Sequence, residues 1–287
     1  MPSENRFGRF SPKTLACRLP LTTDHSFKPI LLLQRLLSVF QSRKPGFETG
    51  GHSVAGKKPV NEDNYLIETK PAACLLLVAD GVGGHGHGDW ASQTCVQMYR
   101  ETFRSIRNLN DPAAFLRENT LNVARRVLQK HAEDPAYKNC GTTLTGFLVK
   151  DGHYHVINIG DSRCYAWRPS HGLRRLTKDH SLVQQMMDAG TLTEAEAANH
   201  PYRSTMTSAI GQPLEKIRVD ITGPHKLGKD ERLLAFSDGI HDFLTDAQLA
   251  EILSATPRGT LAQTLVEKAL AAGSTDNVTA CWVSFGF

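Results

Sequence analysis

The sequence predicts an α+β fold in which antiparallel sheets are covered on their outer faces by helices. Two observations lead to this prediction. Several predicted strands follow one another directly, as in hairpins, and the predicted helices come in pairs between groups of strands. The predicted elements lack the repeated strand–helix–strand order that would indicate a parallel sheet. With 287 residues, of which 40% are hydrophobic, the chain is long enough to bury a core without disulfides.

Apolar runs and turn residues predict the elements between residues 74 and 168. The run CLLLVA at 74–79 is typical of a buried strand. A helix is expected from about Asp89 to Ile106, and Asp111 before Pro112 predicts the N-cap and first turn of the next helix. Three strands should then follow, at 143–149, 153–159 and 164–168, with Asp151–Gly152 as the turn between the first two.

The C-terminal part is predicted by the same signals. A short helix is expected at 180–189, ending near Gly190, and the polar stretch 191–215 is expected to be mostly loop. The remaining predicted elements are a strand at 232–237, helices at 246–253 and 260–272, and a last strand at 278–285.

Positive charge is concentrated at the N-terminus. Eight Lys and Arg against two acidic residues give residues 1–44 a charge of +6, which leaves −2 for the rest of a chain with net charge +4. This distribution argues against nucleic-acid binding by the body. Residues 1–45 are therefore predicted to be a basic leader, flexible or partly an amphipathic helix after Pro29, and residues 46–287 the functional domain. A docking segment, a membrane-surface anchor or targeting peptide, and a start codon placed too far upstream remain open for the leader.

Cysteines and apolar runs bear on the compartment. The six cysteines are scattered singly, which favours free thiols in a reducing cytoplasm over a disulfide framework. No apolar run approaches the roughly 18–20 residues that a membrane span needs.

Acidic residues next to glycine or turn residues stand at the ends of apolar runs. A single Asp-Gly pair is more often a plain turn than a ligand. Five such clusters on separate predicted strands are better explained by a cation, because like charges brought together repel unless they are neutralised. Carboxylate and carbonyl oxygens suit Mg²⁺ and Mn²⁺. The clusters are NEDN (61–64), LLLVADGVGG (75–84), INIGDSR (157–163), LLAFSDGIHD (233–242) and STDN (274–277).

A pair of dications can lower the pKa of a bound water to about 7 and polarise a phosphoryl oxygen. The sequence lacks the G-x-S-x-G elbow, the cysteine-phosphatase loop and the Walker loop that other phosphoryl or acyl chemistries use. Metal-assisted hydrolysis of a phosphate ester is therefore the favoured reaction class.

These motifs resemble, in order and spacing, those of the PPM or type-2C metal-dependent serine/threonine protein phosphatases, in particular the bacterial branch. The resemblance extends from about Gly46 to Phe287 and rests on NEDNYL, VADGVGGHGHGDWAS, CGTTLTGFLV, VINIGDSRCYAW, LTKDHSLVQQMMDAG, FSDGIHDFL and TDNVTACWV. It implies a four-layer α-β-β-α sandwich with two central antiparallel sheets flanked by helix pairs. It also implies hydrolysis of phosphoserine and phosphothreonine with two Mn²⁺ or Mg²⁺ ions and a weaker third.

The resemblance also assigns roles to single residues. Asp80 would bridge both metals and be the central catalytic residue, and the Gly81 carbonyl, Asp238 and Asp276 would complete the ligands. Glu62 and Asp63 would act mainly through metal-bound waters, and Asp161 would help to hold the third ion. Asn277 would support Asp276. Residues 190–211 match a mobile flap beside the site.

Two departures from the family pattern concern the substrate. Lys58 stands where many members have an arginine for the substrate phosphate, which predicts weaker but working phosphate binding because lysine lacks the bidentate fork. Val82 stands where some members have a histidine that acts as general acid. His85 or His87 could donate that proton instead. The alternative is that they are loop histidines that cap the following helix or face solvent.

The resemblance further implies a phosphoprotein substrate, a cognate Ser/Thr kinase, a monomeric state and a cytoplasmic location, with no nucleic-acid partner. One alternative keeps the fold and makes the chain a pseudophosphatase that binds phosphoproteins. Others are a hydrolase of small phosphate esters, and a regulatory module recruited to a membrane or assembly by its basic leader.

Overall fold

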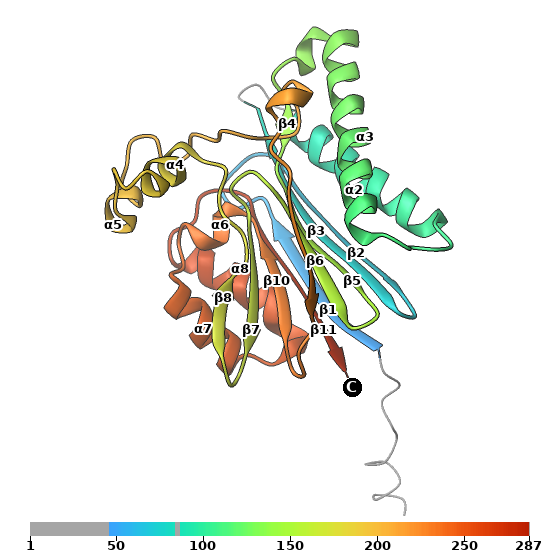
Figure 1. Ribbon diagram of the computed structural model, residues 1–287. Helices are drawn as coiled ribbons and strands as arrows, with labels where there is room; N and C mark the ends of the chain where they lie inside the picture. Colours follow the sequence, from blue (N-terminus) through green and yellow to red (C-terminus); the bar gives the residue numbers. More distant parts are fainter. Residues whose placement is uncertain (1–45, 84–86, 287) are drawn as a thin grey trace, which may run out of the picture. The chain divides into compact units, whose positions relative to one another are not determined.

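Two antiparallel β-sheets lie face to face in the computed structural model, which describes residues 46–83 and 87–286 (Figure 1). The first sheet has the order β1-β11-β10-β7-β8 and the second the order β2-β3-β5-β6-β9, with β4 paired to β3. The strands of the first sheet are β1 (Gly46–Val54), β11 (Val278–Gly286), β10 (Arg232–Phe236), β7 (Arg163–Arg168) and β8 (Gly172–Arg175). Those of the second are β2 (Asp63–Lys70), β3 (Ala73–Val82), β4 (Gly141–Thr142), β5 (Leu144–Lys150), β6 (His153–Ile159) and β9 (Asp220–Lys226).

Helices cover the outer face of each sheet. Helices α2 (Gly88–Ser105) and α3 (Pro112–Glu133) pack on the sheet that contains β3, while α7 (Asp246–Ala255) and α8 (Leu261–Ala271) pack on the sheet that contains β11. A third apolar cluster fills the space between the two sheets. The described residues therefore form the predicted α-β-β-α sandwich, and Figure 1 shows the helix pairs on opposite sides of the sheets.

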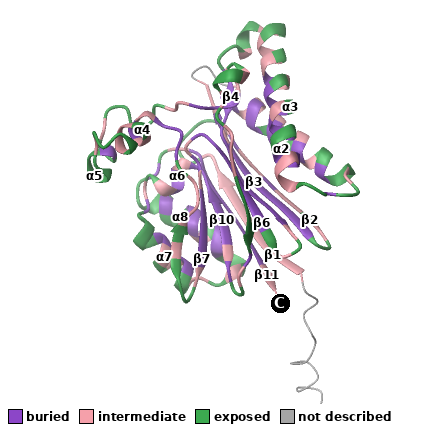
Figure 2. Ribbon diagram, viewed as in Figure 1, coloured by how far each residue is buried: buried purple, intermediate pink, exposed green. Residues whose placement is uncertain are grey.

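The burial pattern follows from strand alternation. Along β6, Tyr154 and Val156 face the space between the sheets, whereas Ile157 and Ile159 pack under the helices α2 and α3. Because the central strands are covered on both faces, Leu75, Leu76 and Leu77 are all fully buried. Figure 2 shows this buried centre against the more exposed outer helices. The edge strand β9 is exposed along most of its length.

Most predicted elements are confirmed. The turn at Asp151–Gly152 has positive φ at both residues, and Asp111 caps α3 by accepting a hydrogen bond from the backbone nitrogen of Ala114 at 2.9 Å. The helix predicted at 180–189 begins later, as α4 (Leu182–Asp188), because Ser181 is its N-cap. The stretch 191–215 is mostly loop, but it contains the helix α5 (Glu194–Ala197).

Strands β1, β2, β4, β8 and β9 and helix α6 (Asp238–His241) were not predicted. β1 is half-buried throughout, and β8 and β9 are largely exposed edge strands, so none has a long apolar run. In β1, Gly50 and Gly51 weaken the strand signal, yet a Cβ at Gly50 would lie 2.6 Å from the indole nitrogen of Trp282.

Five of the six cysteines lie in the described part of the chain, and all five are buried free thiols, as predicted. Cys17 and the predicted leader lie outside the described residues. No helix in residues 46–83 and 87–286 combines the length and apolar character needed to cross a bilayer.

Candidate functional site

Five aspartates meet where the two sheets end, and we call this group the carboxylate edge. From the second sheet, Asp63 begins β2 and pairs directly with Asp80 of β3. From the first, β10 ends and β11 begins side by side, since the backbone nitrogen of Ser237 donates to the carbonyl of Thr279 at 3.1 Å. The members of the carboxylate edge are Asp63, Asp80, Asp161, Asp238 and Asp276.

Burial and neighbouring charges raise the pKa of four members of the carboxylate edge. Burial raises the pKa of Asp80 well above its usual range, and the charges of Asp63, Asp238, Asp161 and Asp276 raise it further. Burial likewise raises the pKa of Asp238 strongly, that of Asp63 to about 6 and that of Asp161 to about 7. Repulsion of this kind around the buried Asp80 and Asp238 is typical of a site that favours a cation.

Hydroxyl groups hold the Asp63 carboxylate and the backbone of Asp80. Ser237 Oγ donates to Asp63 Oδ2 at 2.7 Å, while Asp63 Oδ1 is buried and has no hydrogen-bond partner among the described residues. The backbone nitrogen of Asp80 donates to Thr143 Oγ1 at 3.0 Å, and Thr142 Oγ1 donates to the Asp80 carbonyl at 3.0 Å. The sequence interpretation missed these hydroxyls, although each stands in a quoted motif, CGTT or FSDG.

Glu62 and Gly81 join β3 to the start of α2. The Glu62 carboxylate accepts from the Gly88 backbone nitrogen at 3.1 Å, at the first residue of α2. Its carbonyl accepts from the Gly81 nitrogen at 3.1 Å and from Ser92 Oγ at 2.5 Å. A Cβ at Gly81 would overlap the backbone of Gly88, so only glycine allows this close approach.

Lys58 lies on an exposed loop at the rim of the carboxylate edge. Its Nζ is 3.2 Å from Asp276 Oδ1, and the two side chains are 49% and 45% exposed. The Asn277 side chain anchors the loop, because it donates to the carbonyls of Ala55 and Val60 at 2.9 and 3.0 Å and accepts from the Glu62 nitrogen at 2.8 Å. The contact of Asn277 with Asp276 is made by its backbone nitrogen instead.

The histidine candidates lie near the start of α2. His85 is outside the described residues. His87 occupies the N-cap position with φ 119°, but its side chain makes no capping hydrogen bond. The His87 ring stacks on Tyr137 with 4.1 Å between the centroids, so it neither caps the helix nor stands free in solvent. Val82 ends β3 and pairs with Gly141.

A buried ion-pair cluster follows Asp161 and was not predicted. Arg163 binds Asp179 through three hydrogen bonds of 2.7–3.1 Å, and Arg175 pairs with the same carboxylate. Although burial acts in the opposite direction, these arginines lower the pKa of Asp179. The next residue, His180, binds the backbone nitrogen of Gly160 and the Asp220 carboxylate, which ties the root of α4 to the turn that carries Asp161.

The five aspartates lie near one another without forming a ready-made coordination site among the described residues. Across the described ranges, no three His, Cys, Asp or Glu side chains are already arranged to hold a metal ion. The structure thus brings together the predicted Asp63, Asp80, Gly81, Asp161, Asp238 and Asp276, with Glu62 and Lys58 at the rim.

Residues 50–272 match the family model described as protein phosphatase 2C. The chain belongs to the protein phosphatase 2C family. This match covers well over half of the chain and includes most of the carboxylate edge. An enzyme of this family is what the sequence motifs predicted.

Individual members of the protein phosphatase 2C family agree with this assignment. The serine/threonine phosphatase Stp of Listeria monocytogenes is 31% identical over 224 residues, which are 76% of this chain and 88% of the relative. The crystal structure of the Mycobacterium tuberculosis serine/threonine phosphatase PstP/Ppp has a TM-score of 0.75 at 29% identity and covers 83% of this chain and 98% of its own. A PstP catalytic domain in complex with two manganese ions has a TM-score of 0.73 at 27% identity, covering 85% of this chain and 100% of its own.

Proposed function

We propose that this chain hydrolyses phosphoserine and phosphothreonine in proteins, with water as the attacking group at a centre of two Mn²⁺ or Mg²⁺ ions. The observation that carries the proposal is the carboxylate edge, where aspartates from both sheets come together and, with burial, raise the pKa of Asp80 and Asp238. Membership of the protein phosphatase 2C family supports the substrate class, and the two manganese ions of the related PstP domain support the cofactor.

The donor set fits hard divalent cations. Carboxylate and carbonyl oxygens are the ligands that Mg²⁺ and Mn²⁺ prefer, and the buried, unpartnered Asp63 Oδ1 leaves an acceptor free for a bound water or ion. Asp80, the Gly81 carbonyl, Asp238 and Asp276 would hold the two ions, Glu62 and Asp63 would act through water, and Asp161 would help to hold a weaker third ion. When bound, two dications supply a water of lowered pKa and polarise the phosphoryl oxygen.

The residues of the chain position the reaction. Ser237 holds Asp63 by a hydrogen bond, and the hydroxyls of Thr143 and Thr142 bind the backbone nitrogen and carbonyl of Asp80. Lys58 approaches the substrate phosphate from the rim, where its flexible side chain exchanges Asp276 for a phosphate oxygen. His85 remains the proposed proton donor to the leaving serine or threonine oxygen.

The proposal extends to partners and place. The substrate is a phosphoprotein made by a Ser/Thr kinase, which this enzyme opposes. The chain acts as a monomer in the cytoplasm and has no nucleic-acid partner, in keeping with the five free cysteines of the described residues and the negative charge of its body.

The deciding experiment measures phosphate release from a phosphothreonine peptide with and without Mn²⁺. We expect activity that depends on Mn²⁺, and Asp80→Asn should reduce kcat by at least about 100-fold, since even partners of metal ligands are worth 10–100-fold. Asp230→Asn is the matched control, because Asp230 is exposed and its φ of 60° suits asparagine. A wild type inactive on both the peptide and p-nitrophenyl phosphate would favour the phosphoprotein-binding alternative.

A further inference from the structure

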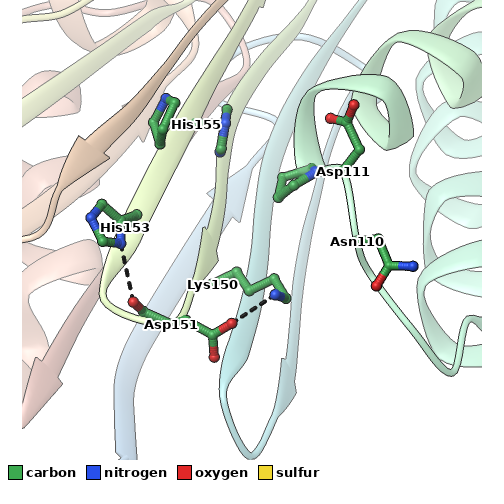
Figure 3. A pocket seen from close by; sticks show the side chains of 8 residues that line it. Asn110, Asp111, Lys150, Asp151, His153 and His155 are labelled. Carbon is green, nitrogen blue, oxygen red and sulfur yellow. Dashed lines mark hydrogen bonds and ion pairs between the residues drawn. The ribbon is translucent and has the colours of Figure 1, made fainter.

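A pocket of about 410 Å³ lies on the second sheet where β5 turns into β6, at the opposite end of these strands from Asp80 (Figure 3). Its floor is the outer face of the β5–β6 hairpin. The start of α3 and Pro224 of β9 form its sides. Two histidines, His153 and His155, line this pocket and have no part in the proposed phosphatase reaction.

His155 is a buried polar side chain that lacks a partner. It is 8% exposed, and it makes no hydrogen bond to any residue that the structure describes. Its ring is held in place because it packs against Gly223, where an added Cβ would come within 3.0 Å of the ring. Its ring nitrogens are not among the fully buried side-chain atoms that lack a partner, so they open into the pocket and are available to a ligand there.

His153 stands two residues before His155 on β6, so both side chains point to the same face of the strand. Its Nδ1 lies 3.1 Å from the Asp151 carbonyl, and because a carbonyl only accepts, this nitrogen carries the proton. The lone pair is therefore on Nε2. A histidine that donates one ring nitrogen to a backbone carbonyl and offers the other is in the form that binds metal ions.

Charge around the pocket favours a cation over an anion. Two carboxylates, Asp111 and Asp151, line it, and the positive charge of Lys150 is paired with Asp151 at 2.6 Å. One oxygen of Asp111 caps α3 through the bond to Ala114, which leaves the other oxygen to accept from a metal-bound water.

We propose that His153 and His155 form a two-histidine chelate for a late first-row transition ion such as Zn²⁺, Ni²⁺ or Cu²⁺. Imidazole nitrogen prefers these ions to the Mg²⁺ or Mn²⁺ that suit carboxylates. Because no three protein donors are already arranged as ligands, water fills the remaining positions, with Asp111 as its acceptor. The site is separate from the carboxylate edge and binds a different class of metal.

Calorimetric titration of Zn²⁺ into the full-length, untagged chain in excess Mg²⁺ tests this proposal. We expect one Zn²⁺ ion that Mg²⁺ does not displace. His153→Ala removes an exposed ligand without risk to the fold and should weaken Zn²⁺ binding by at least about tenfold, as should His155→Gln. His171→Ala, an exposed histidine at the β7–β8 turn, is the matched control and should bind as the wild type does.

A second measurement identifies the donors directly. With Cu²⁺ as the probe, the electron paramagnetic resonance spectrum of the wild type should show coupling to two nitrogens, and that of His153→Ala to one. Unchanged Zn²⁺ affinity in His153→Ala and His155→Gln would overturn the proposal, as would Zn²⁺ binding that excess Mg²⁺ abolishes.

Discussion

Two sites of opposite chemistry lie near the two ends of strands β5 and β6. At one end, the carboxylate edge buries aspartates that repel one another, and burial raises the pKa of Asp63 to about 6. At the other end, the pocket holds a buried histidine, and burial lowers the pKa of His155 below its ordinary value. The same physical cause, loss of water around a titratable group, thus favours the neutral form at both ends and gives them opposite dependence on pH.

The two sites also differ in the groups that balance their charge. Hydroxyl groups donate to the carboxylate edge, and among the described residues the exposed Lys58 is the one cation that pairs with it. Its negative charges therefore favour the binding of hard dications. The pocket presents neutral nitrogens beside carboxylates, which suits a softer ion. Four substitutions would break or sharpen this contrast, and they follow in order of expected effect.

Asn277→Ala should have the largest effect, because one amide anchors the whole loop at the carboxylate edge. Loss of its three hydrogen bonds should lower the free energy of unfolding by about 4 kcal/mol. Chemical denaturation measures this change. Asn122→Ala, on the exposed face of α3, is the control and should be neutral or slightly stabilising. Equal stability of the two variants would show that the loop does not depend on Asn277.

Asp63→Asn should change how stability depends on pH in the metal-free protein. The folded pKa of Asp63, about 6, lies above its ordinary 3.8, so its contribution is complete below about pH 4 and is lost as pH rises through 6. In EDTA at pH 8, the variant should therefore be more stable than the wild type by about 2 kcal/mol.

Denaturation of the wild type and Asp63→Asn at several pH values in EDTA gives, for each protein, the slope of the free energy of unfolding against pH. Asp230→Asn controls for the loss of one charge. A wild type whose stability rises between pH 4 and 6 in parallel with that of Asp63→Asn would contradict the assigned shift.

Lys58→Ala should raise the KM for a phosphothreonine peptide by about tenfold and change kcat less, since a hydrogen bond to a charged group is worth about 1.5 kcal/mol. Lys58→Arg should lower KM below that of the wild type, because the guanidinium binds phosphate through two hydrogen bonds. Steady-state kinetics in saturating Mn²⁺ measures both variants. An unchanged KM in Lys58→Ala would show that Lys58 does not bind the phosphate.

His155→Gln should have the smallest effect on stability. The pH dependence that His155 contributes has the opposite sign to that of Asp63. Because the folded pKa of His155 lies below 6.5, its contribution is complete above pH 6.5 and is lost as pH falls from there. In EDTA, acidification from pH 7 to 5 should lower the free energy of unfolding less in the variant than in the wild type. The two losses should differ by less than about 1 kcal/mol. Thermal unfolding over this range provides the measurement, and identical slopes for wild type and variant would remove the contrast between the two ends.

Local chemistry made much of the fold predictable. The run at 74–79 favoured a buried strand, Asp111–Pro112 favoured the start of a helix, and Asp151–Gly152 supplied the positive φ angles of a tight hairpin. β1 and β9 escaped prediction because one is half-buried and contains Gly50 and Gly51, and the other is an exposed edge. Their strand conformation comes from pairing partners that are distant in the sequence, β11 for β1 and β6 for β9.

The same division applies to the sites. Acidic residues that end or precede apolar strands predict a carboxylate cluster and its preference for hard cations. This prediction is possible because residue type and strand position are local properties. The loop anchored by Asn277, the hydroxyls around Asp63 and Asp80, and the meeting of His155 with the start of α3 arise from contacts between distant segments. Such contacts depend on how the sheets stack and where the helices cross them, and short-range sequence patterns carry no signal for that geometry.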